Sequence, residues 1–257
     1  MKHLLYLMAA AGLLLASCEK NALTIPVDTV TSGARLKLIN AAPDLPGGVE
    51  VAINGKKFSA FTPSGATASS PGIPVGVPFN NTFPAVGSSY AIVTPGAASL
   101  SLTSPATTTA NSATAVGTSN VTLDDNGYYS LFVVGTGQQP DVLLIKDNFD
   151  QLTSPTKFYV RFVNLIPNAT TTYDLLLSDG RTVVAQNIGY KAASAFVTLD
   201  VLSSPSLVLR ASGSTTNIGT AATFTNLANG RVLTLFARGV VGRTGAAAPG
   251  LSLYVNR

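Results

Sequence analysis

The chain has 257 residues, of which 46% are hydrophobic and only 11% are charged, and its formal net charge is +4. Charged residues make up about 25% of a typical soluble domain, so the polar surface must come largely from hydroxyl and amide groups. The basic residues are scattered apart from the pair Lys56-Lys57. This argues against nucleic-acid binding, because that function needs clustered basic side chains.

The chain opens with MKHLLYLMAAAGLLLASC, which has the layout of an exported leader. Its apolar run, Leu4 to Leu15, is too short for a membrane span, which needs about 20 residues. Leu15-Ala16-Ser17-Cys18 resembles the lipobox of bacterial lipoproteins. That resemblance implies cleavage before Cys18 and attachment of lipid to its thiol. An ordinary signal peptide with a chance cysteine and a short membrane anchor are the alternatives.

Processing at this site would change the chemistry of the chain. His3 is the only histidine and Cys18 the only cysteine, so residues 18–257 would contain no histidine and no free thiol. A Ser-His-Asp triad, a Cys-His pair and a histidine-ligated metal site are then excluded. We therefore expect no enzyme activity, no catalytic or metal residue and no cofactor, and we assign Cys18 alone, as the lipid attachment site.

Residues 1–17 are thus predicted to be a lipoprotein signal peptide and residues 18–32 a flexible tether. The tether contains no aromatic residue and includes a Thr-Val-Thr-Ser run. We expect lipid on Cys18 to anchor the protein in the cell envelope, at the outer membrane. The sequence leaves the periplasmic and the surface side equally open.

Residues 33–150 begin with the stretch RLKLINAAPDLPGGVEVAINGKK at Arg35. The stretch alternates polar and apolar residues as a half-buried strand does, breaks at Pro43, alternates again and ends at the hairpin signal Asn54-Gly55. Further strand patterns are predicted at residues 90–93, 99–102, 121–123, 128–134 and 141–146.

Two long stretches of this region are predicted to be loops. Residues 62–89 (Thr62 to Ser89) carry five prolines, which leaves room for at most one short edge strand. Residues 104–119 (Ser104 to Ser119) form a low-complexity Thr/Ala/Ser tract that we expect to be exposed. Both loops are candidate contact surfaces, because loops on a rigid scaffold commonly carry recognition. Tolerated surface insertions are an equally good explanation.

Two Asp/Asn clusters, residues 124–126 and 147–150, place oxygen donors close together, as calcium sites do. Neither has the spacing of a calcium-binding loop. We therefore interpret the first as a hairpin turn and the second as an interdomain bend, in which Asp and Asn side chains bond to their own backbone.

Residues 155–257 repeat the same order of strand patterns. The stretch VRFVNLIPNATTTYDLLLSDGR parallels the opening one, at an offset of 124 residues in the pairs Asn40/Asn164 and Pro43/Pro167. Each copy offers about seven short strands in roughly 100 residues, which is typical of an immunoglobulin-like sandwich. The predicted fold is all-β, with two tandem immunoglobulin-like antiparallel β-sandwich domains after the signal peptide. The short connection between the copies suggests that they lie end to end.

The stretch LKLINAAPDLPGGVEVAINGK, with the later YAIVTPGAASLSL and NGYYSLFVVG, resembles the domain of unknown function 4397 family. The resemblance implies an exported or surface-attached bacterial protein with tandem copies and no defined activity. The second copy departs from the motif, because Asn168 stands for Asp44 and Asp174 for Glu50. A glycosidase-like pair of carboxylates would therefore keep only one acid in the second copy.

These features favour a non-catalytic, lipid-anchored cell-envelope protein that acts as a binding or structural module with an unidentified ligand. An accessory subunit of a larger envelope complex is one alternative, and an enzyme acting on glycan or wall is a disfavoured one. The expected partners are the membrane, through lipid on Cys18, and an envelope protein or a glycan. Tyr90, Tyr128 and Tyr129 are the nearest candidates for the aromatic platform of a glycan site, although such residues more often pack in a core.

Overall fold

A computed structural model describes residues 31–59, 61, 63–70, 72–109, 112–167, 170–200, 206–224 and 230–257. The predicted signal peptide, nearly all of the tether and Cys18 lie outside the described residues. The segment Ser32–Arg257 forms one compact unit. Within the described residues, every regular element is a β-strand except the short 3-10 helix η1 (Gly245–Ala247), and no helix there is long and apolar enough to cross a membrane.

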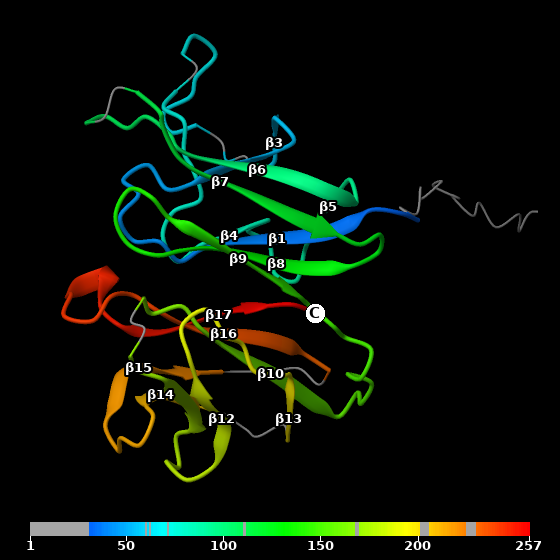
Figure 1. Cartoon of the computed structure of the whole chain (residues 1–257), viewed down its shortest axis with the longest axis vertical. Helices are drawn as coiled ribbons and strands as arrows, with labels where there is room; N and C mark the ends of the chain where they lie inside the picture. The colour runs from blue at the N-terminus through cyan, green and yellow to red at the C-terminus, as the bar shows by residue number, and fades with distance from the viewer. Residues whose placement is uncertain are drawn as a thin grey trace, which may run out of the picture. The chain divides into compact units, whose positions relative to one another are not determined.

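The first half of this unit is a β-sandwich of two sheets, which confirms the predicted fold class (Figure 1). Inner sheet 1 has the order β4-β1-β8-β9, with β5 also paired to β1, and contains β1 (Ala34–Asn40), β4 (Thr82–Phe83), β5 (Ala91–Val93), β8 (Tyr128–Val134) and β9 (Asp141–Lys146). Outer sheet 1 has the order β3-β2-β6-β7, and contains β2 (Glu50–Ile53), β3 (Lys56–Lys57), β6 (Gly96–Ser104) and β7 (Thr114–Leu123). Asn54 and Gly55 have φ of 50° and 76°, as the predicted two-residue hairpin requires.

The second half is a β-sandwich with the corresponding strand orders. Inner sheet 2 has the order β13-β10-β16-β17, and contains β10 (Lys157–Asn164), β13 (Val197–Asp200), β16 (Val232–Arg238) and β17 (Gly250–Val255). Outer sheet 2 has the order β12-β11-β14-β15, and contains β11 (Tyr173–Leu177), β12 (Val183–Ile188), β14 (Ser206–Ala211) and β15 (Asn217–Thr223).

Each inner sheet contains one parallel pair, which refines the antiparallel prediction. β1 pairs parallel with β8, and β10 pairs parallel with β16. A parallel pair needs a long crossover between its strands, and here the crossover is the chain's passage through the outer sheet. The chain therefore returns to the inner sheet in the direction in which it left, as β8 beside β1 and as β16 beside β10.

The structure agrees with the prediction for the first of the two loops and differs from it for the second. Residues 62–89 contain one short edge strand, β4, as predicted, and an isolated bridge from Val49 to Val77 fastens the segment to the chain before β2. Residues 104–119 are not a loop throughout, because β7 begins at Thr114 and pairs with β6. The Ala, Gly, Ser and Thr of β7 have little strand preference of their own, and pairing with a neighbour decides their conformation.

The two sandwiches pack through their inner sheets, so the end-to-end prediction is wrong. Alternate side chains of the inner strands fill their own sandwich, such as Leu36 and Leu38 of β1 in the first core. The other set meets the opposite sandwich in a shared apolar cluster of Ile39, Ala41, Phe132, Val134, Val163, Leu165, Phe236 and Tyr254. Figure 1 shows β8 and β9 of inner sheet 1 lying against β16 and β17 of inner sheet 2. Both inner sheets are therefore covered on both faces.

Candidate functional site

Asn40 and Asn164 hold the two proline corners in the same way. The Asn40 Nδ2 donates to the Val77 carbonyl oxygen at 2.8 Å, and its Oδ1 accepts the N–H two residues further on at 2.9 Å. Asn164 donates to the Ile188 carbonyl oxygen at 3.0 Å and accepts the N–H two residues further on at 3.0 Å. Both asparagines are 0% exposed. They shape the corners and are closed to a ligand.

The two carboxylates near the first corner do not face each other. Asp44 is paired with Arg243 of the second sandwich and accepts the Gly137 N–H at 2.6 Å. The hydrogen bond from Arg243 is the main cause that lowers the pKa of Asp44. Glu50 is paired with Lys57 at 2.5 Å on outer sheet 1. The corner therefore lacks the facing acids that glycoside hydrolysis needs.

The same structural use of acids extends through the described chain. Asp150 is the described acidic residue whose carboxylate has no hydrogen-bond or ion-pair partner among the described residues. All the others accept a hydrogen bond or an ion pair from the protein: Asp44, Glu50, Asp124, Asp125, Asp141, Asp147, Asp174, Asp179 and Asp200.

The first Asp/Asn cluster is a turn, as interpreted from the sequence. The Gly127 N–H donates to the Asp124 carbonyl oxygen at 3.1 Å, and Asn126 has a positive φ of 59°. The Asp124 carboxylate accepts Lys146 Nζ at 2.7 Å and the Tyr129 hydroxyl at 2.9 Å. Among the described residues, no group of three or more His, Cys, Asp or Glu is placed to hold a metal ion.

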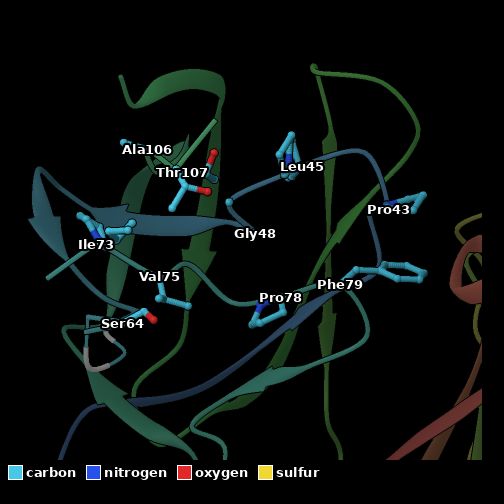
Figure 2. Close-up of a pocket in the computed structure, with 14 residues that line it drawn as sticks. Pro43, Leu45, Gly48, Ser64, Ile73, Val75, Pro78, Phe79, Ala106 and Thr107 are labelled. Carbon is cyan, nitrogen blue, oxygen red and sulfur yellow. The ribbon is translucent and has the colours of Figure 1, made fainter. Parts of the chain in front are cut away.

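The first proline corner and the two predicted loops meet around one solvent-open hollow of about 490 Å3, which we call the loop groove (Figure 2). It is lined mainly by apolar side chains and prolines, with hydroxyls as its polar side chains, and none of its lining residues is charged. The lining residues labelled in Figure 2 come from the corner (Pro43, Leu45, Gly48), from the first loop (Ser64, Ile73, Val75, Pro78, Phe79) and from the second loop (Ala106, Thr107).

Close backbone contact fixes one wall of the loop groove. The N–H of Val49 donates to the Val77 carbonyl oxygen at 3.0 Å, and the Val77 N–H donates back at 2.7 Å. Gly48 has a φ of 71°, and a Cβ there would lie 2.6 Å from the Val77 carbonyl oxygen. Only glycine fits this position without strain. The corner and the first loop are thus held together as one rigid edge.

A second group of polar residues is buried between the inner sheets and was not anticipated. We call it the buried polar cluster, and its members are Lys37, Tyr90, Ser130, Asp147, Arg161, Thr234, Tyr254 and Asn256. Most of them occupy the strand positions that alternate with the core residues. In the sequence these positions look solvent-facing. The feature that could have indicated a buried polar contact is a polar residue at the centre of an otherwise apolar strand, as at Ser130 and Arg161.

Arg161 and Asp147 form the centre of the buried polar cluster. Their side chains are 3% and 0% exposed, and Arg161 Nη2 lies 2.6 Å from Asp147 Oδ1 as an ion pair. Within the described residues, Arg161 Nε has no hydrogen-bond partner. The other Asp147 oxygen accepts the hydroxyls of Tyr90 at 2.8 Å and Ser130 at 2.7 Å.

The surroundings shift the pKa values of Arg161 and Tyr90 upwards. Burial lowers the pKa of Arg161, but Tyr254 and Asp147 outweigh it, so the pKa is raised overall. Burial also raises the pKa of Tyr90, and Asp147 adds to the effect. The cluster thus links the two sandwiches, because Arg161 and Tyr254 of the second contact Ser130 of the first.

Lys37 makes the buried polar cluster sensitive to pH. It is 0% exposed, and its Nζ donates to the carbonyl oxygens of Gly87 at 2.7 Å and Val255 at 3.2 Å. Burial lowers the pKa of Lys37 from 10.5 to about 8, against the opposing attraction of Asp147. Tyr90 and Tyr254 face the same ammonium group through their rings, at 5.2 and 5.7 Å.

We expect alkaline pH to stabilise the wild type relative to Lys37→Met. Between pH 8 and 10.5 the folded Lys37 binds fewer protons than the unfolded one, so the free energy of unfolding rises with pH across this window. Urea denaturation of both proteins at pH 7, 8, 9 and 10 measures the difference, and the other titrating groups cancel in the comparison. A difference that stays constant with pH would show that Lys37 is not titrated in this way.

The three candidate tyrosines have different environments. Tyr129 is 4% exposed and belongs to the first core. The Tyr90 hydroxyl is used in the buried polar cluster. Tyr128 is half-buried, has the Arg35 guanidinium over its ring at 5.2 Å and lines a separate hollow.

These observations define an all-β protein of packed β-sandwiches. Its loop groove is uncharged, and most of its described carboxylates form hydrogen bonds or ion pairs within the protein. Within that class, the chain belongs to the family described as domain of unknown function (DUF4397), whose model matches residues 34–172. No curated protein sequence matches the chain.

Three solved structures show distant similarity. A family 26 carbohydrate-binding module from Eubacterium rectale, in complex with maltoheptaose, has 12% identity and a TM-score of 0.26, over 85% of this chain and 95% of its own. A candidate cell adhesion protein from Bacteroides fragilis has 10% identity and a TM-score of 0.22, over 88% and 98%. A candidate cell adhesion protein from Bacteroides ovatus has 10% identity and a TM-score of 0.20, over 87% and 98%. Such low values transfer no ligand or partner to this chain.

Proposed function

We propose that this protein is a non-catalytic, lipid-anchored module of the cell envelope that binds a partner through the loop groove, with two tandem copies of the family domain as its scaffold. The observation that carries the proposal is the use of the acids. With the exception of Asp150, every described carboxylate is held by a protein group. General acid–base or nucleophilic chemistry needs such a group free to meet a substrate.

The loop groove is the proposed contact surface for an envelope partner. It lies where two loops and a rigid corner meet, and its apolar lining gains free energy when it is covered. Within it, Ile73 is 37% exposed. Val86 lies on the same loop, is 73% exposed and is not among the lining residues of the loop groove. These two residues offer a matched pair of variants.

We expect Ile73→Asp to reduce partner capture at least about fivefold, because a carboxylate in an apolar contact must lose its hydration. Val86→Asp, which makes the same change outside the groove, is expected to capture the partner as the wild type does. The measurement is crosslinking in intact cells followed by pull-down and quantitative comparison of the three proteins. Equal capture by all three would refute the loop groove as the contact surface.

The proposed anchor is tested separately through Cys18. The wild type is expected in the membrane fraction and released only by detergent, whereas Cys18→Ala is expected to be soluble after export. Surface proteolysis of intact cells then distinguishes a surface-facing from a periplasmic protein. Membrane association of Cys18→Ala equal to that of the wild type would refute a lipid anchor at this residue.

A further inference from the structure

A second hollow, distinct from the loop groove, lies where the two sandwiches are joined. It measures about 780 Å3, and we call it the junction pocket. Both Asp/Asn clusters of the sequence contribute to it, although they come from different turns. The residues used below are Tyr128, Lys146, Asp147, Phe149, Asp150, Thr153 and Arg257. A volume of this size lies within the range of small-molecule sites, about 300–1,000 Å3.

The junction pocket is held in a fixed shape by contacts outside it and within its lining. Asp147, at its floor, is fixed by the ion pair with Arg161. Phe149 packs on Phe196 with ring centres 6.0 Å apart. Within the lining, the Arg257 Nη2 donates to the Leu152 carbonyl oxygen at 2.8 Å. Such prior fixation lowers the ordering cost of binding.

The polar groups of the junction pocket suit a neutral ligand rather than an ion. Lys146 is paired with Asp124, and the floor Asp147 with Arg161, so these charges are largely neutralised. The Asp150 carboxylate is exposed, accepts no hydrogen bond from the described residues and attracts the Lys146 ammonium group through its charge. The wall therefore offers charged and amide donors and acceptors side by side, without a strong excess of either sign.

Two aromatic rings complete the junction pocket. Tyr128 and Phe149 meet edge to face, with ring centres 5.3 Å apart, and both are half-buried. Rings next to carboxylate, amide and ammonium groups match the surface of a sugar, which has apolar C–H faces and a rim of adjacent hydroxyls. Charge-assisted hydrogen bonds to hydroxyls are stronger than neutral ones.

We infer that the junction pocket binds a saccharide of one or two rings, with Asp150 as an acceptor for its hydroxyls and Tyr128 and Phe149 as apolar contacts. This deepens the proposed function, since it rests on the premise of a binding protein and adds a ligand class and a second site. The loop groove has no carboxylate and one aromatic ring, Phe79, so it does not share this chemistry.

The test is a calorimetric or NMR titration of the full chain that carries Cys18→Ala, so that the protein is not attached to a membrane. The probes are glucose, N-acetylglucosamine and the β-1,4-linked dimer of N-acetylglucosamine. We expect millimolar binding of at least one probe and a loss of at least about tenfold in Asp150→Ala, because a charged hydrogen bond is lost. The melting temperature should be unchanged, since Asp150 holds no other side chain.

Two further variants make the result specific. Asp200→Ala makes the same charge change at a side chain that is 76% exposed on the second sandwich, and it should bind the probes as the wild type does. Thr153→Trp places a large ring in the junction pocket at an exposed lining residue, and it should abolish binding. Binding that survives both Asp150→Ala and Thr153→Trp, or no binding of any probe by the wild type, would overturn the inference.

The loop-groove variant separates this inference from the proposed function. Loss of saccharide binding in Ile73→Asp, with retention in Asp150→Ala, would place the sugar in the loop groove and overturn the junction pocket. Failure of all three probes together with partner capture that depends on Ile73 would overturn the saccharide alone and leave the proposed function standing.

Discussion

Replacing Arg161 with methionine is expected to lower the free energy of unfolding by about 3–5 kcal/mol, because it leaves a buried carboxylate without its counter-charge. The Asp147 side chain is 0% exposed, and hydroxyls of Tyr90 and Ser130 hold its second oxygen. The carboxylate is therefore buried and engaged by protein groups, although Asp147 lies next to the junction pocket. Urea denaturation at pH 7 measures the loss.

Two further variants isolate the effect of the buried charge. Arg243→Met removes an ion pair whose side chains are 41% and 22% exposed, and we expect little change, because exposed pairs contribute little to stability. Arg161→Met combined with Asp147→Asn should recover most of the loss, since a buried amide costs less than a buried carboxylate. An equally small effect of Arg161→Met and Arg243→Met would show that breaking the buried ion pair is not costly.

Replacing Phe132 with alanine is expected to cost about 3–5 kcal/mol, as is usual for a large ring removed from a packed interior. Phe132 is 0% exposed, and its ring centre lies 6.1 Å from those of both Phe236 and Tyr254 in the second sandwich. The side chain belongs to the shared cluster and not to the core of its own sandwich. The cost thus measures the packing of the inner sheets.

Phe162→Ala is the matched control, because Phe162 is also 0% exposed but lies in the core of the second sandwich. Both variants, like the wild type, should unfold in a single transition, since the two cores share a buried layer. Two separate transitions in the wild type, or a cost below about 1 kcal/mol for Phe132→Ala, would show that the sandwiches do not depend on each other.

The strands were predictable wherever side chains alternate, because that period belongs to the backbone itself. β1 and β2 follow from the opening stretch, and the Asn54-Gly55 turn follows from residues that tolerate a positive φ. β7 and β15 were missed or underestimated because Ala, Gly, Ser and Thr pack weakly and form strands only beside a neighbour. Their partners, β6 and β14, directly precede them in the chain, but the weak side-chain pattern of β7 and β15 does not mark the pairing.

Alternation also failed to reveal the packing of the two sandwiches. It separates the two faces of a strand, but it does not say whether the second face meets water or another sheet. Lys37 and Arg161 occupy second-face positions and are buried. The partner of Asp44, Arg243, lies 199 residues away, and no local rule connects the two.

The candidate sites were predicted only in part. The two loops of the loop groove were named from their composition, since proline and low complexity mark exposed segments. Their convergence on the first proline corner depends on the pairing of β1 with β4 and on the contact between Val49 and Val77. The first Asp/Asn cluster was recognised as a turn and the second as a bend, but the burial of Asp147 beside Arg161 was not anticipated. The meeting of both clusters with Tyr128 and Arg257 in one hollow follows from the tertiary fold alone.

The parallel pairing of β1 with β8 has a mechanical consequence. β1 starts beside the turn at Asp125 and ends at the corner that lines the loop groove, so a tether at one end and a partner at the other would load it along its axis. Where β1 is instead pulled from its start against β8, the registered pairs from Arg35 to Asn40 would bear the force together, in shear, instead of opening one by one. Resistance to such a force depends on the unfolding rate and not on equilibrium stability. The direction of one strand thus decides how the hydrogen bonds of its sheet would respond to such a pull.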